Sequence, residues 1–125
     1  MADRIRITAG SVTVEAELLD NETARRIYGA LPIDASANTW GDEIYFTIPV
    51  DCPREQDARA EVEVGELGYW LAGSGFCIFY GRTPMSTGNQ PVAASEVKVF
   101  GRIVGDATLL RGTRSGTRVT IEKAE

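Results

Sequence analysis

The chain has 125 residues and a mass of 13.6 kDa, the size of one ordinary domain spanning residues 1–125. Apolar residues make up 43% and charged residues 25%, so the composition is that of a globular protein and excludes a disordered or fibrous chain. The net charge of −5 argues against a nucleic-acid partner, because phosphate contacts need a basic surface.

Two residue types limit the chemistry of the chain. It has no histidine, which excludes Ser-His and Cys-His nucleophiles, histidine bases and ordinary zinc sites. Cys52 and Cys77 form no CxxC motif and no secretory signal is visible, so we expect free thiols and a cytoplasmic location. No apolar stretch approaches the roughly 20 residues that span a bilayer, so we expect no membrane segment. We also expect no metal and no cofactor.

The first third of the chain changes from strand to helix periodicity. Alternating apolar residues predict two strands joined by a tight turn over residues 4–18. Apolar spacings of three and four then predict one amphipathic helix, capped by Asp20 or Asn21 and ended by Pro32. Residues 33–40 are polar and mixed and predict no regular element.

The middle of the chain returns to strand periodicity. Alternation predicts strands over residues 44–48 and 61–64. Residues 68–71 and 76–80 are apolar on both faces, which is typical of strands covered on two sides. Residues 81–95 are rich in Gly, Pro, Ser, Thr and Asn, and they predict a loop long enough to indicate a function.

The last third completes the predicted fold. Residues 97–103 and 119–121 predict strands, and Asp106 can cap a short helical turn that ends at Gly112. The elements are mostly in hairpin spacing. They predict a mainly β fold, a closed antiparallel β-barrel of about eight strands with one long and one short helix capping its ends.

Aromatic residues gather in the middle of the chain, where eight of the ten lie between residues 40 and 80. Such rings line ligand grooves as readily as they fill cores, and core filling is the commoner role of any single ring. Alternation places Tyr45 opposite Ile44 and Phe46, and Trp40 lies in a turn, so both rings are free to face a cleft. We predict a cleft for a peptide or small molecule lined by Trp40, Glu43, Tyr45, Tyr69, Trp70, Phe79, Thr83 and Met85.

The carboxylates and thiols offer weaker candidates for chemistry. Asp42 and Glu43 are adjacent on a strand and point to opposite faces, so they cannot act as a pair. Glu43 could meet Glu66 across strands, although carboxylates satisfied by arginines or backbone amides are the commoner case. Cys77 lies in an apolar strand and is expected to be an inert core residue.

Two stretches resemble the cyclophilin barrel. Residues 73–84, followed by residues 97–104, are similar to the cyclophilin succession of a Gly-Ser-Gln-Phe-Phe strand, a Lys-Thr pair, a loop and a Val-Phe-Gly strand. The whole chain resembles the small bacterial and archaeal cyclophilin-like proteins of uncharacterised function, through residues 38–46, 68–70 and 81–86. The resemblance covers nearly the whole chain and implies a barrel of about eight antiparallel strands with helices at its ends.

The cyclophilin catalytic residues do not carry over with that resemblance. The arginine that holds the substrate carbonyl belongs to a Phe-His-Arg motif, and residues 40–52 contain no arginine. The residues that match belong to the scaffold, and they are Phe76, Thr83, Phe100 and Gly101. The resemblance therefore implies a binding module without the usual catalytic residues.

Several alternatives stay open. The first is a weak peptidyl-prolyl cis-trans isomerase in which Arg82 or Arg54 takes the place of the missing arginine, with Glu43 as a further catalytic candidate. The second is a structural or interaction protein that works as a homodimer; the sequence leaves monomer and homodimer both open. The third is a relative of the cyclophilin-like domains of amide-hydrolysing and oxoproline-processing enzymes.

Overall fold

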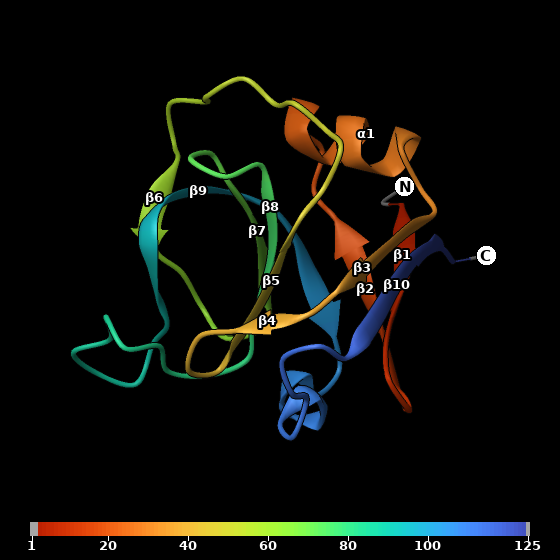
Figure 1. The fold of residues 1–125 in the computed structure, drawn as a ribbon. Coiled ribbons are helices and arrows are strands. Elements are labelled where there is room, and N and C mark those ends of the chain that lie inside the picture. Colours follow the sequence, from red (N-terminus) through yellow and green to blue (C-terminus); the bar gives the residue numbers. More distant parts are fainter. Residues whose placement is uncertain (1–2, 125) are drawn as a thin grey trace.

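The computed structural model describes residues 3–124, and within that range a single antiparallel sheet contains all the strands (Figure 1). One α-helix and one 3₁₀ helix accompany the sheet, and α1 lies near one end of the strands and η1 near the other. The elements in chain order are β1 (Arg4–Ala9), β2 (Val12–Leu18), α1 (Glu22–Gly29), β3 (Ile33–Ser36), β4 (Asn38–Thr39), β5 (Glu43–Thr47), β6 (Arg59–Glu61), β7 (Glu66–Trp70), β8 (Gly75–Phe79), β9 (Val92–Val104), η1 (Ala107–Leu110) and β10 (Arg118–Lys123).

The strand order does not close into a barrel. The strands pair in the order β3-β10-β1-β2-β9-β7-β8-β5-β4, with β6 paired to β9 beside this path. In the described part of the chain no ladder joins β3 to β4, so the mainly β antiparallel fold is confirmed and the closed barrel is not. The two outermost strands, β3 and β4, are consecutive in the chain and are separated only by Ala37. The Ala37 N–H donates to Thr117 O and its C=O accepts from Gly116 N, both at 2.8 Å, so Ala37 contacts the segment that precedes β10.

The helix is shorter than its apolar spacing predicts. It runs from Glu22 to Gly29 and begins where Asn21 Oδ1 accepts a hydrogen bond from the Ala24 N–H at 2.8 Å. Its buried face includes Ala24 and Ile27, which pack against the main core. Within residues 3–124, no helix is long and apolar enough to cross a membrane.

Four strands also differ from the sequence-based prediction. Residues 33–39 form β3 and β4, which are recognisable only through their distant partners β10 and β5. The strand expected over residues 61–64 is displaced to Arg59–Glu61, next to an irregularity in its pairing with β9. β9 begins at Val92, so the Gly- and Pro-rich loop is shorter than expected at its carboxyl end.

Both faces of β8 are buried, as its composition predicts. Phe76 and Ile78 belong to the main core, which all the long strands share. Cys77 and Phe79 point to the opposite face and belong to a second cluster. The second cluster consists of Val62, Cys77, Phe79, Ala93, Val97 and Val99, with Tyr45 and Trp70 packed against it.

Candidate functional site

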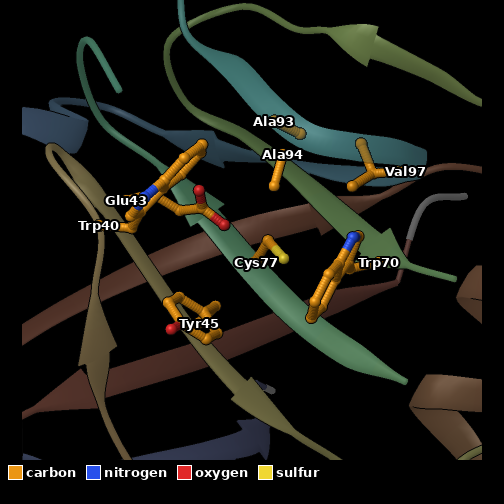
Figure 2. Close-up of a pocket in the computed structure, with 8 residues that line it drawn as sticks. All are labelled: Trp40, Glu43, Tyr45, Trp70, Cys77, Ala93, Ala94 and Val97. Atoms are coloured by element: carbon orange, nitrogen blue, oxygen red, sulfur yellow. The ribbon is translucent and has the colours of Figure 1, made fainter. Parts of the chain in front are cut away.

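A pocket of about 190 Å³ lies on the second cluster, on the opposite face of β8 from the main core (Figure 2). The register of β5 against β8 creates its floor. Tyr45 pairs with Cys77 and Glu43 pairs with Phe79, so Glu43, Tyr45 and Cys77 point to the same side. The pocket is lined by Trp40, Glu43, Tyr45, Trp70, Cys77, Ala93, Ala94 and Val97.

Glu43 is the buried charged group of this pocket. The residue is only 5% exposed, and its buried Oε1 atom has no hydrogen-bond partner. Burial raises the pKa of Glu43 to about 7, and a hydrogen bond from the Cys77 thiol acts weakly in the opposite direction. The carboxyl group therefore gains or loses a proton near neutral pH.

Cys77 is the second ionisable group on the floor. It is 2% exposed, and burial raises the pKa of its thiol well above the ordinary value. The neighbouring Glu43 carboxylate raises that pKa further. The thiol therefore stays protonated and is not an activated nucleophile.

Aromatic rings form the walls. The rings of Trp40 and Trp70 lie on opposite sides of the Glu43 carboxyl group and the Cys77 thiol (Figure 2). The rings of Tyr45 and Trp70 meet edge to face, with centroids 6.5 Å apart and planes at 74°.

Trp70 is fixed from two directions. Its indole Nε1 donates a hydrogen bond to Ser95 Oγ at 2.6 Å. On the other side, a Cβ atom at Gly73 would lie 2.5 Å from the indole ring, so the absence of a side chain there makes room for Trp70.

The turn that carries Trp40 is packed against the start of the Gly- and Pro-rich loop. Gly41 has a φ of +63°, and the Asp42 N–H donates to Arg82 O at 2.8 Å. A Cβ atom at Gly41 would lie 2.8 Å from that same oxygen and 2.9 Å from Thr83 Cα. Only glycine fits this approach, which positions Trp40 over the pocket.

Comparison with known proteins agrees with this architecture. A profile of the family described as Cyclophilin-like matches residues 3–122. The chain belongs to the cyclophilin-like family. The solution structure of the hypothetical protein AF2241 from Archaeoglobus fulgidus is similar over 98% of this chain and 95% of that chain, with 41% identity and a TM-score of 0.83. No curated protein matches the chain.

Four of the eight residues predicted for the cleft of this cyclophilin-like chain line the pocket, and four do not. Tyr69 points into the main core, where its hydroxyl donates to Val50 O at 2.6 Å. Phe79 is fully buried in the second cluster. Thr83 is buried and its hydroxyl donates to Val92 O, which holds the two ends of the loop together, whereas Met85 is 53% exposed.

The two arginines considered for catalysis do not line the pocket of the cyclophilin-like chain. The Arg82 guanidinium group donates to Ser86 O at 3.4 Å, and Arg54 forms an ion pair with Glu96. Glu66 is held by Arg59 at 3.1 Å and Arg102 at 3.3 Å and is not paired with Glu43. Within residues 3–124, no group of three or more acidic or thiol side chains is placed to hold a metal ion.

Sequence reasoning missed four lining residues. Cys77 was expected in the core, and strand parity with Phe79 is the signal that places it on the pocket side. The other three, Ala93, Ala94 and Val97, come from the first half of β9, part of which composition assigns to a loop. The two alanines leave the space that larger side chains would fill.

Proposed function

We propose that this cyclophilin-like protein binds a small molecule, or one side chain of a peptide, in the pocket between Trp40 and Trp70. The observation that carries the proposal is the buried Oε1 atom of Glu43, which has no hydrogen-bond partner. A buried polar atom without a partner costs about 1–3 kcal/mol, and more when it is charged. A ligand that pairs with this oxygen offsets that cost.

The size of the pocket limits the ligand. A cavity of about 150 Å³ accepts a benzene ring, so the 190 Å³ here is enough for one ring with a few further atoms. The aromatic walls would contact the apolar part of the ligand, and Glu43 would bind its polar atom. This division between apolar walls and few polar groups is typical of small-molecule sites.

The proposal is one of binding and not of prolyl isomerisation. Cyclophilin chemistry, as the family resemblance implies, needs an arginine beside the substrate carbonyl. No arginine is among the residues that line the pocket. Arg82 and Arg54 instead contact Ser86 and Glu96, respectively.

An amide NMR titration tests the proposal. One-ring fragments and an Ala-Pro-Phe peptide are added to labelled protein, and we expect shifts at Trp40, Glu43, Tyr45 and Trp70. The Ala94→Leu variant places a larger side chain on the exposed rim of the pocket and should weaken binding. The matched variant Ala58→Leu, outside the pocket, should not.

Two results would contradict the proposal. Shifts that fall elsewhere, or that are the same in Ala94→Leu and wild type, would remove the pocket as the binding site. Proline exchange spectra recorded on the same peptide test the isomerase alternative, because uncatalysed exchange takes about 10–100 s. If the protein accelerates cis-trans exchange of the peptide and the Arg82→Ala variant does not, the isomerase alternative replaces the binding proposal.

A further inference from the structure

We infer that the ligand of this pocket carries a compact organic cation, an alkylammonium group that keeps at least one N–H. The inference rests on the proposed function and names its ligand class. It is carried by the combination of three aromatic side chains with one buried carboxyl oxygen that lacks a partner.

The aromatic walls match a cation. Trp40, Tyr45 and Trp70 come from three different segments and surround the same small space. The faces of aromatic rings carry negative electrostatic potential and attract ammonium groups, with tryptophan the most effective of the three ring types. Two of the three walls here are tryptophan.

The charges around the pocket exclude an anion. The ionisable side chains among the lining residues are Glu43, Tyr45 and Cys77, and each of these is neutral or negative. No lysine or arginine lines the pocket, so a carboxylate or phosphate would meet no opposite charge. The net charge of −5 also attracts cations to the molecule as a whole.

The free oxygen of Glu43 explains the need for an N–H. Once ionised, this carboxylate only accepts hydrogen bonds, and its buried Oε1 atom has no hydrogen-bond partner. An ammonium N–H donates to it, whereas a fully substituted ammonium cannot. The carbon atoms attached to that nitrogen then contact the rings of Trp40 and Trp70.

Neutral Glu43 offers a second possibility, in which the protonated acid donates to a ligand carbonyl or ether oxygen. Three six-membered rings of similar size separate the two cases. Piperidinium is a cation with N–H donors, 2-piperidone is a neutral lactam, and tetrahydropyran is a neutral acceptor. Their dissociation constants are measured by NMR titration of the full chain at pH 6 and pH 8.

The pH series gives an internal test in the wild-type protein. With a pKa of about 7, Glu43 is mostly protonated at pH 6 and mostly ionised at pH 8. Because only the ionised form accepts the cation, piperidinium should bind about tenfold more tightly at pH 8 than at pH 6. Tyr45 and Cys77 are the other ionisable groups facing the pocket from β5 and β8. Burial and the neighbouring Glu43 carboxylate raise the pKa of the Cys77 thiol well above its ordinary value, so this thiol stays protonated over the range.

Two variants separate the contributions. Glu43→Gln keeps the shape of the side chain and should abolish both the preference for piperidinium and its pH dependence. Trp70→Leu keeps the carboxyl group and removes one aromatic wall. It should weaken the binding of piperidinium more than the binding of tetrahydropyran.

The outcomes distinguish the two proposals. If 2-piperidone or tetrahydropyran binds at pH 8 as tightly as piperidinium, the cation inference is wrong and the proposed binding function stands. If piperidinium binds equally at both pH values, or equally to Glu43→Gln, the role of Glu43 is wrong. If no ring perturbs the pocket residues, both the inference and the proposed function fail.

Discussion

At the scale of single residues, strand parity decides which side chains reach the pocket. Tyr69 and Trp70 are neighbours in the chain, yet one fills the main core and the other forms a pocket wall. Alternation along β7 places the two rings on opposite faces of the sheet, so the sequence itself contains this information. The unpartnered oxygen of Glu43 was not predictable, because it depends on how β7, β8 and β9 pack around β5.

Removing the charge of Glu43 should change how stability depends on pH. Its pKa is raised from 4.5 to about 7 in the folded protein, so between these values Glu43 holds more of its proton in the folded chain than in the unfolded chain. The contribution of Glu43 to stability therefore falls as pH rises through this window, by about 3 kcal/mol in total. The free energy of unfolding is measured in urea at pH 4.5 and pH 8. It should fall less between these pH values in Glu43→Gln than in the wild type.

The exposed Glu63 provides a control for that measurement. Glu63→Gln removes the same charge where solvent surrounds it, so it should keep the pH profile of the wild type. A Glu43→Gln variant that follows the wild-type profile as well would mean that the carboxyl group is solvated in the folded protein.

At the scale of elements, the local hairpins were predictable and the short strands were not. Periodicity and one cap residue locate β1, β2 and α1, because these elements depend on neighbouring residues. β3 and β4 are polar and short, and they exist because β10 and β5 supply their hydrogen bonds from far along the chain. The Trp40 turn depends in the same way on a distant loop.

Substitution of Gly41 should disturb that turn. An alanine there combines a φ of +63° with backbone contacts below 3 Å, so we expect Gly41→Ala to lower the free energy of unfolding by about 2 kcal/mol. Gly88→Ala is the matched control, because nothing lies within 4 Å of its Cβ position. Chemical unfolding monitored by circular dichroism measures both, and equal stabilities would contradict the packing described for the turn.

At the scale of the whole molecule, the second cluster is not an independent unit. It shares β8 and β9 with the main core, since the two faces of these strands contribute to the two clusters. The family resemblance located the cyclophilin-like fold in advance. It could not show the strand order, because that depends on pairings between segments far apart in the chain.

The shared strands predict one cooperative unfolding transition. Both tryptophans of the chain line the pocket, so their fluorescence reports the pocket, whereas far-ultraviolet circular dichroism reports the whole sheet. The two signals should give the same midpoint in urea. A fluorescence transition that precedes the loss of strand signal would mean that the pocket side unfolds alone.

The most direct test of the account is a ¹³C NMR titration of the Glu43 side-chain carboxyl group, alone and with piperidinium. The account predicts a midpoint near pH 7 in the free protein, because the group is buried without a charged partner. It predicts a lower midpoint with the cation bound, because the cation favours the ionised carboxylate. A midpoint near the ordinary glutamate value of 4.5 in the free protein would contradict the account, since the carboxyl group would then be solvated or paired.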